Sequence, residues 1–218
     1  KGLNSKKCCV INLKNIKFAT VCSGIGAAEL AAKRVGDFEH MYMAEIDPFA
    51  SAILRYHYPK TPNYGNFLGW RNWPECELDL VISGTPCQSF SVAGSRRSLN
   101  DPRGELTLEF IKYVDAIDPK YIIWENVPGC LSTKDNAFGQ FIGYLSGSQN
   151  ALNPIGTRWA NAGFVSGSKR QIAWRILDAR YFGLAQGRRR VWLCANRYSS
   201  NIRNWACASI LFPNREAG

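Results

Sequence analysis

Residues 16–45 read IKFATVCSGIGAAELAAKRVGDFEHMYMAE, and this stretch predicts the class of fold. The apolar run at 16–21 is typical of a buried strand, and the Ser-Gly-Ile-Gly turn after it leads into a helical pattern at 27–35. Gly36 ends that helix, and a second strand is expected at 41–45. A strand, a helix and a second strand in this order predict a βαβ unit with parallel strands.

The same alternation continues along the first 150 residues. Asp47 is a favourable N-cap, and Pro48 suits the first position of the helix that follows it. Further elements are expected as a helix at 48–58, strands at 63–67, 79–83 and 121–127, and a helix at 106–117. With right-handed crossovers, these elements predict a doubly wound, Rossmann-like α/β fold.

The pattern changes after residue 150. Strands are expected at 171–177 and 191–196, and the segment between them is too short for a crossover helix. These last two strands are therefore predicted to pair antiparallel. The stretches at 146–159 and 162–168 are interpreted as irregular, exposed loops.

Composition and charge narrow the class of protein. The 218 residues are 46% apolar and 20% charged, which is ordinary for a packed globular protein and excludes collagen-like and disordered classes. The net charge is +10, and residues 169–218 alone hold ten Lys or Arg against two Asp or Glu. This excess predicts a polyanionic partner such as nucleic acid, and a solvated basic face is an equal alternative.

The cysteines predict free thiols. Eight cysteines and two histidines include no C-x-x-C pair, so neither a zinc site nor another metal site is predicted. No signal peptide and no apolar run of about 18 residues is seen, so we expect a cytoplasmic protein without membrane association. The sequence has no initiator Met and ends abruptly, which suggests a fragment.

The glycine turn and Glu45 predict a nucleoside cofactor. Gly24 and Gly26 let the backbone approach a ligand, and the Glu45 carboxylate can accept hydrogen bonds from ribose hydroxyls. Glu29 stands where the dinucleotide motif has its third glycine, and a carboxylate there would repel a pyrophosphate. This favours S-adenosylmethionine over NAD or FAD, while a tight turn without a ligand is the alternative.

A thiol and a carboxylate are expected at the crevice beside this turn. Cys87 follows the strand at 79–83, Glu125 ends the strand at 121–127, and the carboxyl ends of neighbouring parallel strands meet at one edge. Neither histidine is expected nearby to activate the thiol, so its substrate must be strongly electrophilic. The alternatives are an inert cysteine and a carboxylate that only caps its strand.

Three consecutive arginines enter the last expected strand. Side-chain alternation puts Arg188 and Arg190 on one face of the sheet and Arg189 on the other. Guanidinium groups suit phosphates and the acceptor edges of bases. A solvated run of charge is the alternative.

Together these motifs resemble the DNA cytosine-5 methyltransferases, in particular phage and Dcm-type bacterial members. The resemblance covers roughly residues 16–200 and is strengthened by the segment WRILDARYFGLAQ at 174–186. The matching motifs are Gly24-Ile25-Gly26, Glu45, Pro86-Cys87-Gln88, Glu125-Asn126-Val127 and Gln186-Gly187-Arg188-Arg189-Arg190. The resemblance implies an S-adenosylmethionine-dependent methyltransferase sheet and methyl transfer to C5 of cytosine in double-stranded DNA.

The resemblance also implies a role for each motif. Cys87 would attack C6 of a flipped-out cytosine, and Glu125 would contact N3 and the amino group. Arg190 would contact O2, and Arg188 would support the site or a phosphate. C5 would then take the methyl group, leaving S-adenosylhomocysteine, and loss of the C5 proton with elimination of Cys87 would release the product. The loop at 84–104 would close over the DNA.

Two further sets of residues follow from the resemblance. The cofactor-binding set is Cys22, Ser23, Gly24, Gly26, Glu45, Ile46, Asn66, Phe67, Gly84 and Leu106. The DNA-binding set is Gln88, Ser91, Arg96, Arg97 and Arg103. Cys22 stands where the family has a phenylalanine that stacks on adenine, and Asn66 stands where it usually has an aspartate.

The family continues into a target-recognition domain, and we expect residues 1–218 to be a catalytic domain without it. The expected partners are double-stranded DNA and a cognate restriction endonuclease, and the expected state is a monomer. An inactive cofactor- or DNA-binding relative and an RNA cytosine-5 methyltransferase are the alternatives. A dehydrogenase is least favoured because of Glu29.

Overall fold

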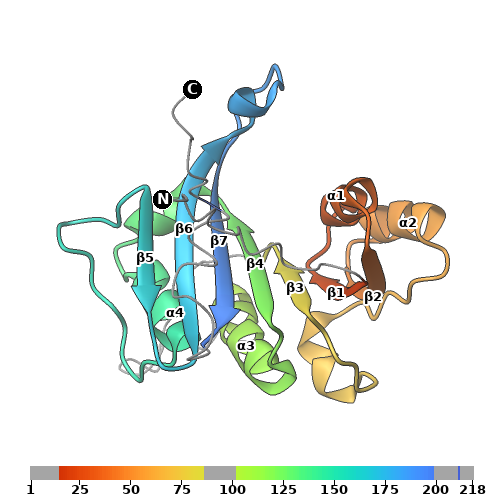
Figure 1. Cartoon of the computed structure of the whole chain (residues 1–218), viewed down its shortest axis with the longest axis horizontal. Helices are drawn as coiled ribbons and strands as arrows, with labels where there is room; N and C mark the ends of the chain where they lie inside the picture. Colours follow the sequence, from red (N-terminus) through yellow and green to blue (C-terminus); the bar gives the residue numbers. More distant parts are fainter. Residues whose placement is uncertain (1–14, 86–101, 199–210, 212–218) are drawn as a thin grey trace, which may run out of the picture.

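The computed structural model describes residues 15–85 and 102–198 together with Leu211. These residues form a seven-stranded sheet in the order β2-β1-β3-β4-β7-β6-β5, with helices on both faces (Figure 1). Strands β2, β1, β3 and β4 are parallel, and β7, β6 and β5 each pair antiparallel with their neighbours. Both the doubly wound α/β class and the antiparallel pairing of β6 with β7 are confirmed.

The elements have the following bounds. The parallel strands are β1 (Ile16–Val21), β2 (Phe38–Ala44), β3 (Leu80–Ser83) and β4 (Tyr121–Asn126). The antiparallel strands are β5 (Ala162–Ser166), β6 (Arg170–Asp178) and β7 (Arg189–Arg197). The α-helices are α1 (Ala27–Val35), α2 (Pro48–His57), α3 (Pro102–Ile117) and α4 (Ala137–Ser146). Short 3-10 helices are η1 (Phe67–Asn72), η2 (Pro128–Ser132) and η3 (Ala179–Phe182).

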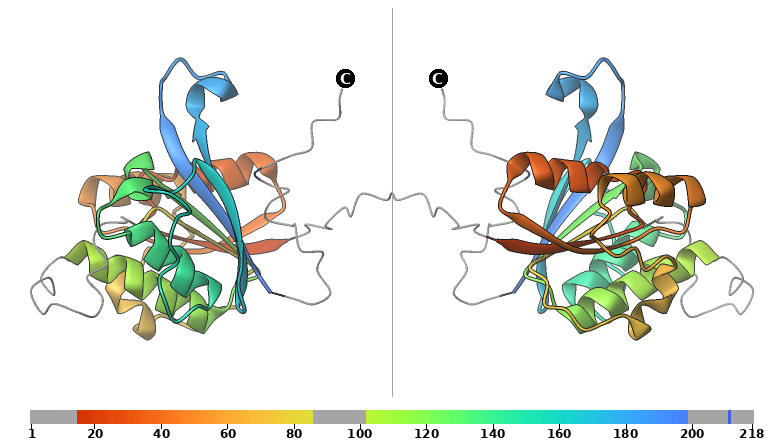
Figure 2. Two further views of the ribbon diagram at one scale, coloured as in Figure 1. Left: turned by 90° about the vertical axis from the view of Figure 1, so that its left-hand side faces the viewer. Right: turned by 90° about the vertical axis from the view of Figure 1, so that its right-hand side faces the viewer.

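The side chains of β4 show how the two faces of the sheet differ. Figure 2 shows α1 and α2 on one side of the sheet and α3 and α4 on the other. Ile122 and Trp124 are buried in the main core on the α3 and α4 side, where the Trp124 ring lies 4.6 Å from that of Phe141. Ile123 packs on the opposite face. Because side chains alternate along a strand, Glu125 also turns to the face that carries α1.

The strand predicted at 63–67 is wrong. Only a single bridge joins Met43 to Asn63, and Phe67 already begins η1. The side-chain oxygen of Asn63 accepts hydrogen bonds from the backbone N–H of Glu45 and of Gly65, both at 3.0 Å. These backbone N–H groups therefore bond to a side chain and not to a neighbouring strand, and the chain leaves the sheet after Asn63.

The exposed loop predicted at 162–168 is also wrong, because residues 162–166 form β5 against β6. Gly163 pairs with Trp174, and a Cβ at position 163 would lie 2.2 Å from the indole ring. The glycine is therefore required by close packing, although glycine weakens a strand signal in a sequence.

Helix α4 has no counterpart among the elements expected from the sequence. Eight of its ten residues are buried, so its apolar residues do not alternate with polar ones at the spacing of a surface helix. In the described part of the chain, no helix is long and apolar enough to cross a lipid bilayer.

Candidate functional site

The carboxyl ends of the parallel strands bring some of the predicted site residues to one edge of the sheet. Val21, the last residue of β1, pairs with Ala44 at the end of β2 and with Ser83 at the end of β3. Ser83 in turn pairs with Trp124 of β4. Four features therefore follow or end neighbouring strands at the same edge of the sheet: the glycine turn, Glu45, the segment leading to Cys87, and Glu125.

The Glu45 carboxylate is fixed against the glycine turn. Its Oε2 accepts a hydrogen bond from the backbone N–H of Gly24 at 2.7 Å, and its Oε1 accepts one from Asp47 at 2.9 Å. Gly24 has a φ of +58°, and a Cβ there would meet nothing within 4 Å. Each carboxylate oxygen keeps a lone pair for a ligand hydroxyl, and open space adjoins the turn.

Exposed apolar side chains lie next to the glycine turn and Glu45 in the sequence. Ile46 is 70% exposed, Phe49 73% and Ile25 62%. A fixed carboxylate can accept hydrogen bonds from the ribose hydroxyls of a nucleoside, and exposed apolar side chains can contact its flat base. Ile25 and Phe49 are additions to the residues selected from the sequence, where only their position next to the motifs marks them.

Cys22 is held in the left-handed region, with a φ of +54°, between β1 and the glycine turn. Burial, with a smaller contribution from Glu45, raises the pKa of its thiol to about 12. The thiol is therefore neutral near pH 7 and unsuited to act as a nucleophile. The Cβ position of Gly84 lies 3.7 Å from the Cys22 carbonyl, so the ends of β1 and β3 approach closely.

Two residues at the start of α1 lie against the interior of the protein. A Cβ at Gly26 would lie 3.1 Å from Leu54 and 3.2 Å from Tyr58, so this glycine lets α1 pack against α2. Glu29 is only 2% exposed and accepts a hydrogen bond from the Thr20 hydroxyl. Burial raises the pKa of Glu29, although the Thr20 bond lowers it in part. The expectation that Glu29 repels a pyrophosphate is therefore wrong, because the carboxyl lies in the interior and burial disfavours its charged form.

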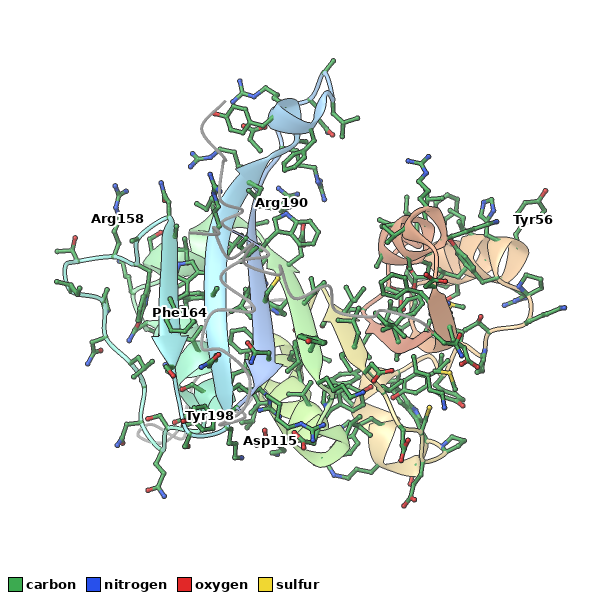
Figure 3. The ribbon with its side chains drawn as sticks, in the orientation of Figure 1. Tyr56, Asp115, Arg158, Phe164, Arg190 and Tyr198 are labelled. Carbon is green, nitrogen blue, oxygen red and sulfur yellow. The ribbon has the colours of Figure 1, made fainter. Side chains whose placement is uncertain are left out.

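Glu125 forms an ion pair with the arginines of the last strand. Its Oε1 lies 2.9 Å from Nε of Arg190 and 3.9 Å from a terminal nitrogen of Arg188. The Glu125 side chain is 28% exposed and that of Arg190 is 23% exposed, so the pair is within reach of a ligand. Figure 3 shows Arg190 near the start of β7, at the carboxyl edge of β4. The predicted placement of Arg188 and Arg190 on one face is confirmed.

Thr85, a residue that the sequence did not single out, anchors the chain just before Cys87. Its carbonyl accepts a hydrogen bond from the Asn126 amide at 2.9 Å, and its hydroxyl accepts one from the Trp124 indole at 3.1 Å. Thr85 is fully buried. The strand that carries Glu125 thus also holds the end of the strand that leads to Cys87.

Several predicted site residues lie outside the described part of the chain. Their placement stays a prediction: the residues are Cys87, Gln88, Ser91, Arg96 and Arg97, and the side chain of Arg103.

The remaining members of the cofactor set occupy other surroundings. Asn66 caps η1, where its side-chain oxygen accepts from the Leu68 N–H at 3.0 Å. Phe67 is 2% exposed and packs edge-on against Tyr113 in the main core. Leu106 packs against the same core. The described structure therefore shows Phe67 in the interior and not at the open edge.

The two histidines lie on elements remote from β4. His40 is in β2, which is separated from β4 by β1 and β3, and stacks on Phe18 with 4.5 Å between ring centroids. Burial lowers the pKa of His40 to about 4, so its imidazole is neutral near pH 7. His57 is the last residue of α2.

Comparison with known proteins connects these features to a family. A model of the C-5 cytosine-specific DNA methylases matches residues 16–216. A protein of Escherichia phage P1, described as a DNA N-6-adenine-methyltransferase, is 38% identical over 84% of this chain and 29% of its own length. The type II methyltransferase M.AquIA of Picosynechococcus is 32% identical over 86% of this chain and 74% of its own length.

Solved structures show the same fold. Dnmt2 methyltransferase of S. pombe matches with a TM-score of 0.61 at 18% identity, over 93% of this chain and 57% of that chain. A DNA modification methyltransferase encoded in an E. coli prophage matches with a TM-score of 0.60 at 20% identity, over 84% of this chain and 47% of that one. The chain therefore spans about half the length of these structures and less than a third of the phage P1 protein.

Proposed function

The chain belongs to the C-5 cytosine-specific DNA methylase family, and we propose that it transfers a methyl group from S-adenosylmethionine to C5 of a cytosine in double-stranded DNA. The observation that carries this proposal is the pair of Glu125 and Arg190, 2.9 Å apart, on the side of the sheet where β3 leads toward Cys87. A carboxylate beside a guanidinium offers an acceptor and donors to one polar edge of a cytosine ring.

In the proposed reaction, the thiol of Cys87 gives its proton to water, and its Sγ forms a bond to C6 of a cytosine that has left the base stack. The electron pair of the C5–C6 double bond moves toward C5 and spreads to N3, where Glu125 holds a proton. Arg190 donates to O2 and stabilises charge there. C5 then bonds to the methyl carbon as the bond from that carbon to sulfur breaks, which releases S-adenosylhomocysteine. The C5 proton leaves to water, and the bond from C6 to Cys87 breaks to restore the double bond and return the thiolate.

We infer that the cofactor is held by the edge formed by β1 and β2. Bound S-adenosylmethionine supplies an electrophilic methyl group. The Glu45 carboxylate, fixed by the Gly24 N–H at 2.7 Å, accepts from the ribose hydroxyls, and Ile46 offers apolar contact to the base. The open space at Gly24 lets the ligand approach the backbone.

The division of the protein into domains is a proposal as well. Residues 1–218 are proposed to act as a catalytic domain, and the family model matches residues 16–216 of this range. The chain matches 29% of the length of the phage P1 protein, so most of that relative lies outside the matched region. A cognate restriction endonuclease and a monomeric state stay predictions.

The decisive experiment is covalent trapping on duplex DNA that contains 5-fluorocytosine, in the presence of S-adenosylmethionine. Because fluorine cannot leave C5 as a proton does, the bond to Cys87 is expected to persist and to shift the protein on a denaturing gel. Cys87→Ser should abolish the adduct, whereas the control Cys76→Ser should retain it. An adduct on Cys87→Ser would refute the assigned nucleophile.

The same preparation decides among the alternatives. Incorporation of labelled methyl groups into duplex DNA, compared with transfer RNA, separates a DNA from an RNA methyltransferase. Binding of S-adenosylmethionine or DNA without incorporation into either nucleic acid would support the inactive relative.

A further inference from the structure

A second cationic site lies on the face of the sheet opposite Glu125. Two adjoining cavities of about 260 and 360 Å³ open between η2, the segment before β5 and the hairpin of β6 and β7. Both are lined by Asn161, Ile176 and Arg189. We name the first cavity the arginine pocket; its principal lining residues are Ser132, Arg158, Trp159, Asn161, Ile176 and Arg189.

The arginine pocket holds two arginines that form no ion pair with the described residues, since Asp178, the strand partner of Arg189, pairs with Arg180 instead. Among the described residues, neither Arg158 nor Arg189 has a carboxylate within 4.0 Å, in contrast to Arg180, which pairs with Asp178 at 2.7 Å. Both arginines are exposed. Two unpaired guanidinium groups in one concave site attract an anion and present several parallel donors to it.

The floor of the pocket is rigidly built. The Trp159 indole donates to the side-chain oxygen of Asn136 at 2.8 Å and packs edge-on against Trp174, with 5.7 Å between ring centroids. The Asn161 carbonyl accepts from the Ile176 N–H at 2.8 Å. These contacts fix the backbone from which Arg158 projects, so the pocket is present before any ligand binds.

The pocket and the Glu125 site meet across one strand. Arg189 and Arg190 are consecutive, with Cα atoms about 3.8 Å apart, and they project to opposite faces of β7. Arg190 pairs with Glu125, and Arg189 lines the pocket. Figure 3 shows Arg158 and Arg190 toward the same edge of the molecule. A polyanion that reaches Glu125 over this edge would therefore pass the mouth of the pocket.

We propose that the arginine pocket binds a backbone phosphate of the duplex DNA next to the target cytosine, with Arg158 and Arg189 as its ligands. The assignment of DNA as the ligand rests on the proposed function, whereas the presence of a cationic pocket does not depend on it. A phosphodiester fits better than a carboxylate metabolite, because the neighbouring Glu125 site is itself proposed to face a nucleotide. Phosphate contacts of this kind position the nucleic acid and carry no sequence information.

The test measures duplex DNA binding by fluorescence anisotropy over a series of salt concentrations. Arg158→Gln and Arg189→Gln are each expected to weaken binding about three- to tenfold and to lower the slope of log affinity against log salt by about one. Arg189→Lys should keep most of the slope, because it keeps the charge. The matched control is Arg55→Gln, an exposed arginine on α2 at the far end of the sheet, which should leave both quantities unchanged.

The outcomes separate this inference from the proposed function. Equal thermal unfolding midpoints would establish that the variants are folded. If the parent protein methylates DNA while both glutamine variants bind like Arg55→Gln, the pocket proposal is overturned and the function stands. If the slopes fall but no methyl transfer occurs, the pocket proposal holds and the function fails. A larger effect on RNA than on duplex DNA would overturn the assignment of the ligand.

Discussion

Glu125 and Asn126 are two consecutive residues with separate tasks. Because side chains alternate along β4, the Glu125 carboxylate turns toward Arg190, and the Asn126 amide turns to the other face and donates to the Thr85 carbonyl. One strand end therefore presents an acceptor at the proposed substrate site and also positions the segment that leads to Cys87.

At the residue scale, we predict that Glu125→Gln lowers the rate of methyl transfer about a hundredfold or more. The amide can still form hydrogen bonds but cannot hold a proton at N3 as a carboxyl group can. The measurement is kcat for labelled methyl transfer, and duplex binding should change far less. Glu39→Gln, an exposed residue of β2, is the control; an equal loss in that variant would point to a general defect.

We further predict that Asn126→Asp slows formation of the 5-fluorocytosine adduct at least tenfold, with little change in KM. The aspartate keeps the oxygen that accepts from the Val127 N–H at 2.8 Å, but loses the amide donor to Thr85. The buried Thr85 carbonyl is then unsatisfied and faces a carboxylate, so the segment before Cys87 shifts. An unchanged adduct rate would show that this hydrogen bond does not position the thiol.

At the scale of elements, Glu109 joins η1 to α3. Its carboxylate accepts from the Arg71 guanidinium and the Lys112 ammonium, both at 2.6 Å, and from the Trp70 indole at 3.1 Å. Burial alone would raise the pKa of Glu109, but these three hydrogen bonds outweigh it and lower the pKa to about 2. The charged form is thus favoured by folding.

The depressed pKa predicts an acid-dependent loss of stability. The contribution of Glu109 to the free energy of unfolding is present above its ordinary pKa of 4.5 and is lost as the pH falls toward about 2. Urea unfolding at a series of pH values should therefore give a shallower decline for Glu109→Gln than for the parent. The exposed Glu75→Gln should follow the parent curve, and a Glu109→Gln curve parallel to the parent would contradict the assignment.

At the scale of the whole molecule, Arg170 connects the antiparallel half of the sheet to the helices beneath it. It is 2% exposed at the start of β6 and donates to Asp115 of α3 at 2.6 Å. It also donates to the carbonyls of Val114 at 2.8 Å and of Leu145 at 3.2 Å. A single buried guanidinium thus satisfies acceptors on α3 and α4 and holds β6 against both helices.

We predict that Arg170→Ala lowers the free energy of unfolding by about 3–5 kcal/mol, since it leaves buried acceptors without donors. The neighbouring Lys169 also pairs with Asp115 but is half exposed, so Lys169→Ala should cost less than about 1 kcal/mol. Urea denaturation measures both. A loss below about 1 kcal/mol for Arg170→Ala would show that water replaces its contacts.

How much the sequence reveals differs from element to element. Strand β1 and helix α1 have the predicted bounds, because apolar periodicity and glycine caps are local signals. Strand β5 was not predicted, because a glycine weakens the strand signal. The reason for Gly163, its close packing against the Trp174 ring, is visible only in the structure. Likewise, the sequence predicted that the Glu29 carboxylate would face a ligand at the turn, and only the packing of α1 shows that this side chain is buried.

The sequence alone determined the parallel α/β pattern of the first strands and helices, the alternation of Arg188, Arg189 and Arg190, and the motifs that identify the family. These depend on neighbouring residues and on fixed spacings along the chain. The tertiary structure decided which distant groups meet, Glu125 with Arg190 and Asn126 with Thr85, and it placed Arg158 and Arg189 in the lining of one pocket. The physical reason is that burial and hydrogen bonding between distant residues arise only when the sheet brings its strands side by side.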